Sequence, residues 1–166
     1  TLAVIRRAGD PLDNRHRIDH YYFGPRPPLG SNGGETIRIG TSEESLSASN
    51  SIVERNIFDR TSGEVEIVSI KSGGNIIREN LLIEAQGAIV LRHGNGNLVE
   101  RNIFLGKGVP DTGGVRVINR DQTVRGNYFE GLAGTSFKSA ISVMNGVPNS
   151  VINRYHQVAN ARIEGN

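Results

Sequence analysis

The sequence predicts an all-β fold, a right-handed parallel β-helix built from coils of about 22–26 residues. Two families of short segments rich in Val and Ile recur along the chain and advance in step. Gly is abundant, with 21 residues, and Asn recurs between the apolar stretches, which is typical of many tight turns. The apolar positions do not follow a helical period, and Gly, Asn, Val and Ile all disfavour helix.

The first repeated segment places an Asn after a short apolar stretch. Successive asparagines are separated by 24, 22, 25 and 39 positions, and the last interval carries an insertion of about 14 residues. We expect these asparagines to stack, because Asn tolerates a left-handed backbone and its amide can bond the next Asn in the stack. The copies cover residues 51–58, 75–82, 97–104, 123–129 and 161–166, with Asn56, Asn80, Asn102, Asn127 and Asn166 as the repeated residue.

A second family of segments lies between these copies. Its members cover residues 65–70, 87–91, 114–118 and 140–144, and the marker residues Ile67, Ile89, Val115 and Ile141 are 22, 26 and 26 positions apart. Strands this short are not stable alone, so we expect the coils to stack about 4.8 Å apart and to bury one stripe. A leucine-rich repeat has a similar period, but its fixed leucine pattern is absent.

Length and composition narrow the class of protein. The 166 residues can form one domain with a buried core, and we expect residues 1–166 to be a single β-helix domain. Because the chain has no Cys, it has no disulfides and no thiolate metal sites. A net charge of +2 does not require nucleic acid, and no apolar run approaches the roughly 20 residues of a membrane span, so we expect neither partner.

The two ends of the sequence indicate a piece of a longer chain. Residues 1–7 do not form a signal peptide, because their apolar stretch is short and charges follow at once. Residues 164–166 stop inside a repeated motif. We therefore expect a fragment whose export signal, if there is one, lies elsewhere.

A metal site is the first candidate for chemistry. Glu64 and Glu66 are two positions apart on a predicted strand and would point to the same face. Adjacent carboxylates repel each other unless a cation or protons compensate them. Together with the amide oxygen of Asn32 from the preceding coil, they would make a hard-cation site that suits Ca²⁺. A solvated strand face without a metal is the alternative that spacing leaves open.

Three basic residues follow on the same face. Lys71 ends the strand of the two glutamates, and Arg92 and His93 end the corresponding strand one coil later. Counting from the marker isoleucines places His93 level with Lys71 and Arg92 level with Ile70. Strict alternation would bury Arg92, so we expect a bulge that turns it outward. An amine, a guanidinium and a cation on one face suit abstraction of a proton next to a carboxylate, whereas either basic residue alone would be ordinary surface charge.

Other polar residues are less informative. Arg116 and Arg120 lie on the following coil and could bind an acidic substrate or simply face solvent. His16 and His20 could contact a ligand, although packing of a loop is the simpler interpretation. The four His residues lack metal-ligand spacing of the HExxH kind, and neither a GxSxG nor a phosphate-loop motif is present.

Taken together, these motifs resemble those of the family 6 polysaccharide lyases, which include alginate lyases and chondroitinase B. The resemblance extends from about residue 15 to the C-terminus and implies a right-handed parallel β-helix. It rests on the segment 32–40, which reads Asn-Gly-Gly-Glu-Thr-Ile-Arg-Ile-Gly, on Glu64-Val65-Glu66 followed by Lys71-Ser72, and on Arg92-His93-Gly94.

The resemblance implies a role for each matching residue. Lys71 would be the Brønsted base that takes the C5 proton of a uronic acid, Arg92 the acid-side partner and His93 a substrate contact. The calcium ligands would be Asn32, Glu64 and Glu66. The implied reaction is β-elimination, which cleaves a 1,4 glycosidic bond and leaves an unsaturated uronate at the new non-reducing end.

The resemblance also implies a partner and a location. The substrate would be an acidic polysaccharide, with alginate preferred and dermatan sulfate as the nearest alternative, and the enzyme would be secreted or periplasmic in a bacterium. Such lyases are longer, so terminal coils and part of the groove would be missing and the isolated chain could lack activity. A non-catalytic β-helix, such as an adhesin or a carbohydrate-binding scaffold, is the alternative from another class. The sequence makes no prediction of oligomeric state.

Overall fold

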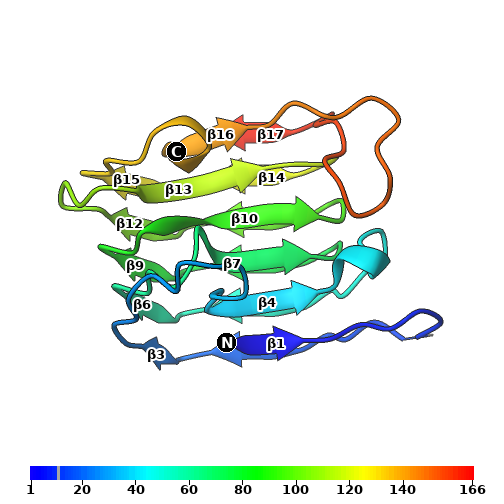
Figure 1. Cartoon of the computed structure of the whole chain (residues 1–166), viewed down its shortest axis with the longest axis horizontal. Helices are drawn as coiled ribbons and strands as arrows, with labels where there is room; N and C mark the ends of the chain where they lie inside the picture. Colours follow the sequence, from blue (N-terminus) through cyan, green and yellow to red (C-terminus); the bar gives the residue numbers. More distant parts are fainter. Residues whose placement is uncertain (11) are drawn as a thin grey trace.

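The computed structural model describes residues 1–10 and 12–166, and three parallel β-sheets run through the stacked coils (Figure 1). The first sheet has the order β1-β4-β7-β10-β13-β16. Its strands are β1 (Leu2–Val4), β4 (Ile37–Gly40), β7 (Glu66–Lys71), β10 (Gly87–His93), β13 (Thr112–Val117) and β16 (Ile141–Val143).

The other two sheets are built from shorter strands. The second sheet has the order β17-β14-β11-β8-β5-β2 and the third the order β15-β12-β9-β6-β3. The second contains β2 (Arg17–Asp19), β5 (Ile52–Glu54), β8 (Ile76–Arg78), β11 (Leu98–Glu100), β14 (Thr123–Arg125) and β17 (Arg162–Glu164). The third contains β3 (Tyr22–Phe23), β6 (Ile57–Asp59), β9 (Leu81–Ile83), β12 (Ile103–Leu105) and β15 (Tyr128–Glu130).

One coil takes one strand from each sheet, and the next coil lies directly beside it. β7, β8 and β9 form one such coil, and each pairs in parallel with its equivalent in the next coil, β10, β11 or β12. The predicted right-handed parallel β-helix is confirmed. Each Asn-containing segment holds two strands rather than one, as β5 and β6 on either side of Asn56 illustrate.

Helical structure is limited to two short 3₁₀ turns, η1 (Ser42–Glu44) and η2 (Ser136–Lys138), in the described part of the chain. Across those same residues, no helix has the length and apolar character needed to cross a membrane.

The interior is filled by rows of aliphatic side chains that the strand register stacks. Ile37 pairs with Val68, Val68 with Ile89, and Ile89 with Val115. All four side chains are fully buried. Because β-branched side chains pack well on a pleated surface, the repeated Val and Ile of the sequence become one continuous core.

Side-chain amides form a second stack at the bend between the second and third sheets. The Nδ2 of Asn56 donates to Oδ1 of Asn80 at 3.0 Å, Asn80 donates to Asn102 at 2.9 Å, and Asn102 donates to Asn127 at 3.0 Å. The ladder ends with Asn127 donating to Asn166 at 2.8 Å. The predicted stacking of these asparagines is therefore confirmed.

The reason we gave for Asn at this place was partly wrong. The left-handed backbone belongs to the residue before each ladder asparagine, with φ of 54° at Arg55, 56° at Glu79 and 52° at Arg101. The asparagine itself is selected by its amide, because each Oδ1 also accepts the backbone N–H of the ladder residue one coil earlier, at 3.0 Å from both Asn56 and Asn80.

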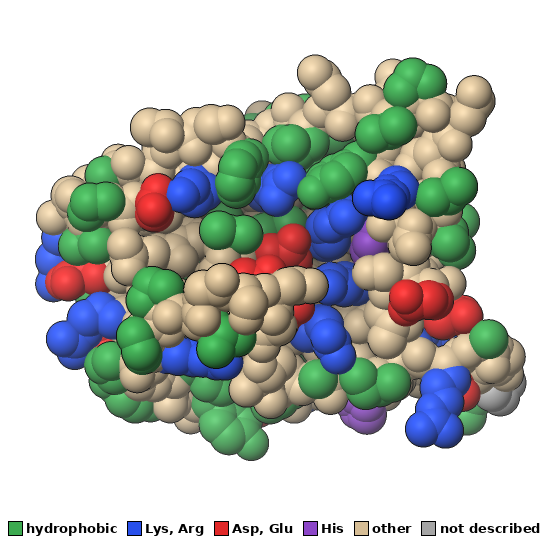
Figure 2. Space-filling view, in the orientation of Figure 1, with side chains coloured by type: hydrophobic (Ala, Val, Ile, Leu, Met, Phe, Trp, Pro, Cys, Tyr) green, Lys and Arg blue, Asp and Glu red, His purple; other side chains and the backbone are tan. Residues whose placement is uncertain are grey.

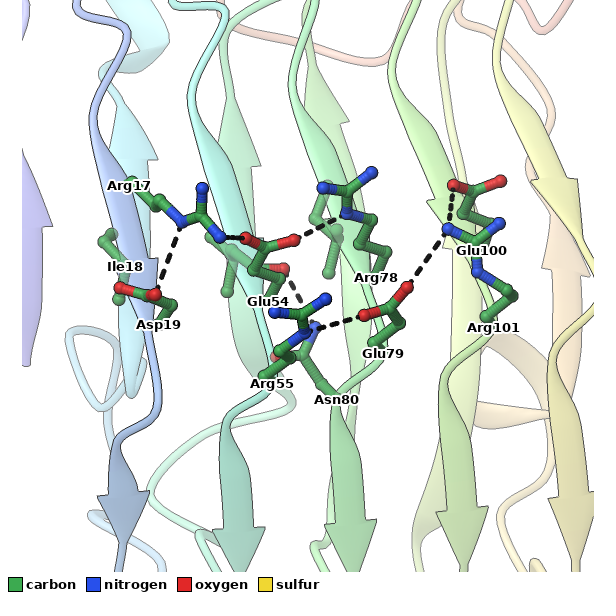
Figure 3. Close-up of polar contacts among 12 residues, drawn as sticks. Arg17, Ile18, Asp19, Glu54, Arg55, Arg78, Glu79, Asn80, Glu100 and Arg101 are labelled. Carbon is green, nitrogen blue, oxygen red and sulfur yellow. Dashed lines mark hydrogen bonds and ion pairs between the residues drawn. The ribbon is translucent and has the colours of Figure 1, made fainter.

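Ion pairs tie the coils together on the outer side of the second sheet (Figure 3). Glu54, whose side chain is fully buried, lies between Arg17 of the preceding coil and Arg78 of the following one, with 2.6 Å from its Oε2 to Nε of Arg78. Glu79 likewise lies between Arg55 at 2.9 Å and Arg101 at 3.2 Å. Partners 22 to 37 positions apart in the sequence are thus brought within bonding distance.

The amide ladder makes a testable contribution to stability. Asn102→Ala removes the acceptor of two hydrogen bonds from Asn80 and leaves buried amide groups without partners. We expect the free energy of unfolding to fall by about 2–3 kcal/mol, measured by urea denaturation. Asn153→Ala, at an exposed loop position, is the matched control. A change no larger than that of the control would mean that the ladder does not hold the coils.

Candidate active site

A β-bulge on β10 takes Arg92 out of the strand ladder. Leu91 pairs with Ile70 of β7. The next pair joins His93 to Lys71, so Arg92 is the extra residue between the two pairs. The expected bulge and the pairing of His93 with Lys71 are confirmed. The expected level of Arg92 was wrong, because Leu91 occupies the place opposite Ile70.

A second bulge, at the start of β7, explains that error. Glu66 pairs with Ala88, and the following pair joins Val68 to Ile89, which leaves Ile67 as the extra residue. The sequence count took Ile67 and Ile89 as partners, whereas Ile89 pairs with Val68. The count therefore began one position out of register. The bulge on β10 restores the register at the other end of the strands. The two bulges re-aim side chains locally. A further register shift lies at the start of β10 where it pairs with β13, between the pairs Gly87–Thr112 and Ile89–Val115.

Arg92 is held from three directions. Its Nε lies 3.9 Å from Oε1 of Glu66, its Nη1 donates to the backbone oxygen of Arg154 at 3.1 Å, and its guanidinium lies 4.1 Å from the centre of the Tyr155 ring. The side chain is 15% exposed. The guanidinium is thus fixed in place and still reachable by a ligand.

Lys71 has a buried carboxylate beside it. Its Nζ lies 3.6 Å from Oε1 of Glu35, whose side chain is only 3% exposed. Glu35 belongs to the coil before Lys71, and the stacking of β4 on β7 brings the two together. The sequence motif contained Glu35, but nothing in its spacing marked it as a partner of Lys71.

Glu66 is also well ordered by its neighbours. It is buried, and its Oε2 accepts a hydrogen bond from the hydroxyl of Ser69 on the same strand. With Arg92 on its other oxygen, Glu66 connects the acidic and basic parts of the face.

Glu64 lies in the bend just before β7, not on the strand itself. Its Oε2 accepts the backbone N–H groups of Gly33 and Gly34, each at 3.0 Å. A side chain at Gly34 would place a Cβ only 2.3 Å from the backbone oxygen of Gly63, so this approach of the two coils requires glycine. Asn32 and Glu64 both line one pocket of about 380 Å³. The strand alternation from which we expected Glu64 and Glu66 to share a face therefore does not position Glu64.

The environment of Glu64 raises the pKa of its carboxyl above the ordinary value. Burial raises the pKa of this carboxyl, and the nearby charges of Glu35 and Glu66 raise it further. The N–H groups of Gly33 and Gly34 oppose the shift. A cation at this place would remove the repulsion among the three carboxylates.

The donor set fits a hard divalent cation such as Ca²⁺. In the described residues, no three His, Asp or Glu side chains are grouped to hold a metal by themselves, so the amide oxygen of Asn32 would be needed. Within the same residues, Glu64 has no ion-pair partner and the only cation near Glu66 is Arg92, at 3.9 Å. Oxygen donors with uncompensated charge are those that Ca²⁺ prefers. The assignment of Asn32, Glu64 and Glu66 as ligands stays a prediction.

The two arginines of the following coil have different surroundings. Arg116, on β13, is buried, and its guanidinium lies 4.8 Å from the centre of the Phe137 ring and 5.6 Å from that of Tyr155. Arg120 is exposed in the turn beyond β13, where its backbone N–H donates to Asn95 at 3.2 Å. The structure thus brings Arg116, but not Arg120, into the neighbourhood of Arg92. Their roles in substrate binding stay predictions.

His93 is fully buried, and neither of its ring nitrogens has a hydrogen-bond partner among the residues that the structure describes. Burial lowers the pKa of His93 to about 3, and the positive charges of Arg92 and Lys71 act in the same direction. The imidazole is therefore neutral near pH 7. Its predicted contact with substrate stays a prediction.

Figure 2 shows the face over the first sheet, with acidic side chains near its middle and Lys and Arg side chains beside and above them. Carboxylates from two coils and basic groups from β7, β10 and β13 thus gather on one surface although they are far apart in the sequence. This arrangement can bind a cation and a polyanion together.

Comparisons with known proteins agree with this geometry. The sequence model of the family described as Chondroitinase B matches residues 1–166. The chain belongs to the chondroitinase B family, family 6 of the polysaccharide lyases. The structure of the family 6 alginate lyase AlyGC is 64% identical in sequence, with a TM-score of 0.93 over 96% of this chain.

Two further solved structures of family 6 lyases resemble the chain. A mannuronic acid-specific lyase from human gut microbiota is 39% identical, with a TM-score of 0.84 over 96% of the chain. An alginate lyase in complex with a trisaccharide is 28% identical, with a TM-score of 0.87 over 96% of the chain. The chain spans 22% of the length of AlyGC and 37% and 38% of the other two. A search of curated proteins found no match.

The site of this family 6 chain contains residues that sequence reasoning missed. Glu35 contacts Lys71 although the strand register places Gly40, not Glu35, opposite that lysine. Ser69 contacts Glu66 three positions away on the same strand. Tyr155 comes from the long insertion before the last repeat, and no repeat period predicts where such a loop returns.

The low pKa of His93 makes stability depend on pH. The unfolded chain gains a proton on this residue below pH 6.5, whereas the folded chain gains it only near pH 3. Acidification across that range therefore favours unfolding, by at most about 1.4 kcal/mol per pH unit for one proton. In His93→Gln this part of the acid sensitivity should disappear, as measured by urea unfolding at several pH values. His16→Gln, at an exposed histidine, is the control. If the free energy of unfolding changes equally with pH in the unchanged protein and in both variants, His93 is not the source of the acid sensitivity.

Proposed function

We propose that the complete protein is a polysaccharide lyase that cleaves a uronate polymer, most readily alginate, by calcium-assisted β-elimination. The observation that carries the proposal is the placement of Lys71 and Arg92 on neighbouring strands beside Glu64 and Glu66. Membership of family 6 and the alginate lyases among its relatives support this reaction. The chain itself would be one segment of that longer enzyme.

Each residue has a part that its position supports. Lys71 is the base, and its amine takes the proton from C5 of the uronate. The electron pair of that C–H bond forms the C4–C5 double bond as the bond from C4 to the glycosidic oxygen breaks. Arg92 lies where its guanidinium can stabilise the departing oxygen, which takes up a proton from water. A bound Ca²⁺ would neutralise the substrate carboxylate and so acidify the C5 proton.

Alginate is preferred over dermatan sulfate because the relative at 64% identity is described as an alginate lyase and the one at 39% as a mannuronic acid-specific lyase. A polymer of this kind is met outside the cell, so we propose that the bacterial protein acts as a secreted or periplasmic enzyme. Arg116 and His93 would contribute to binding the polyanion close to Arg92, and Arg120 would contribute further along the surface.

The reaction is tested by following the ultraviolet absorbance of the unsaturated uronate. The complete protein should produce this absorbance from alginate, and dermatan sulfate is the comparison substrate. Lys71→Ala should lower kcat/KM at least about a hundredfold, because the base of the reaction is lost. Lys107→Ala removes an exposed lysine that pairs with Glu84 in another part of the molecule and is the matched control. Absence of product from every uronate polymer would refute the proposed function.

The calcium site is tested separately from turnover. Titration calorimetry of the metal-free protein with Ca²⁺ should show binding that weakens at least tenfold in Glu64→Gln, because one anionic ligand is lost. Binding should also weaken as the pH falls, since a proton competes with the cation for a carboxyl whose pKa is raised. Glu84→Gln is the control, because Glu84 forms an ion pair with the exposed Lys107 in another part of the molecule. Equal affinity in Glu64→Gln and in the unchanged protein would remove Glu64 from the site.

A further inference from the structure

The long insertion between β16 and β17 returns over the candidate active site. In Figure 1 this loop, drawn in orange to red, runs back from β16 past the ends of several strands of the first sheet. The backbone oxygen of Ile152 accepts a hydrogen bond from the hydroxyl of Ser45 at 2.9 Å, across 107 positions of sequence. A segment near the end of the chain is therefore anchored beside the coil that carries β4.

Tyr155 is the residue of this loop that meets the basic groups of the site. Its ring lies against the guanidinium of Arg92, with 4.1 Å from Cζ to the ring centre. The same ring lies 5.6 Å from the guanidinium of Arg116, whose Nη2 donates to the Tyr155 hydroxyl at 3.5 Å. The neighbouring Arg154 accepts a hydrogen bond from Arg92 through its backbone oxygen, at 3.1 Å.

The tyrosine is itself held in place by packing. It contacts the small apolar cluster formed on the outer side of the sheet by Ala88, Val90 and Ile118, together with Met144. Its ring is therefore supported by side chains of β10 and of the segments that follow β13 and β16. A ring fixed in this way can determine the orientation of a guanidinium stacked on it.

The two arginines need such support, because they are like charges on adjacent strands. Among the described residues, Arg92 forms one ion pair, with Glu66 at 3.9 Å. Arg116 is buried, has no ion pair among the described residues, and its Nε has no hydrogen-bond partner. The negative face of an aromatic ring attracts both guanidinium groups without neutralising them, so their charge stays available for an anionic ligand.

We propose that Tyr155 is a positioning residue for the lyase reaction, which holds Arg92 by ring stacking and Arg116 through its hydroxyl. This inference rests on the proposed function. It assigns separate tasks to the two parts of one side chain. The ring acts on turnover through Arg92, and the hydroxyl acts on binding of the polyanion through Arg116.

The test compares variants of Tyr155 in the complete protein with alginate as substrate. Tyr155→Leu removes the ring and should lower kcat about tenfold. Tyr155→Phe keeps the ring and should recover most of that loss, while KM rises a few-fold because the contact with Arg116 is lost. Tyr128→Leu, at an exposed tyrosine of β15 in the third sheet, is the matched control. If the melting temperatures of the Tyr155 variants match that of the control variant, the substitutions leave the fold intact.

A double-mutant cycle identifies the residue through which Tyr155 acts. In an Arg92→Ala background, assayed at high protein concentration, Tyr155→Leu should lower kcat less than twofold further. A full additional tenfold loss would overturn the inference, because Tyr155 would then act independently of Arg92. A kcat as low in Tyr155→Phe as in Tyr155→Leu would also overturn it and would make the hydroxyl a reacting group. If the unchanged protein has no lyase activity, the proposed function fails and this inference fails with it. If it is active and Tyr155→Leu matches the control, only this inference fails.

Discussion

The parallel pairing of one coil with the next is the constraint on which the rest of the structure depends. It makes residues about two dozen positions apart into neighbours, and the amide ladder from Asn56 to Asn166 holds that spacing by bonding each side chain to the next. The candidate site is a product of this stacking, because Glu35, Lys71 and Arg92 come from three successive coils. No local motif could assemble these three side chains, since each coil contributes one of them.

Strict stacking alone would leave every polar side chain in a straight row, and the two bulges remove that limitation. The extra residue on β7 and the extra residue on β10 cancel in the register of these two strands, and one more residue is extra on β13 where it pairs with the start of β10. Arg92, the extra residue on β10, leaves the ladder and becomes available to neighbours on both sides. The register shifts thus lie on the strands that hold the site residues. The strands of the second and third sheets pair without such a shift.

The repeats predicted the fold well because period and composition both follow from coil stacking. The Asn ladder, the pairing of His93 with Lys71 and the bulge near Arg92 could be anticipated by counting positions. Counting could not locate the first bulge at Ile67, since two consecutive buried residues look like ordinary strand in a sequence. It also could not find Tyr155, because a long loop has no period and its return path depends on contacts such as that between Ser45 and Ile152.

The charges on the outer side of the second sheet have a consequence for how this solenoid can change in length. From Glu54 onward the register places Glu54 beside Arg78, Arg78 beside Glu100, Glu100 beside Arg125 and Arg125 beside Glu164, so the sign alternates along this part of the row. The row begins with Asp19 opposite Glu54, a like-charged pair that Arg17 bridges. Deleting or duplicating a single coil in this row would set like charges directly opposite each other, which is unfavourable. Gain or loss of coils in pairs preserves the alternation. From Glu54 to Glu164, adding or removing two coils therefore keeps opposite charges facing each other, whereas a single coil would need a bridging charge such as Arg17 provides between Asp19 and Glu54.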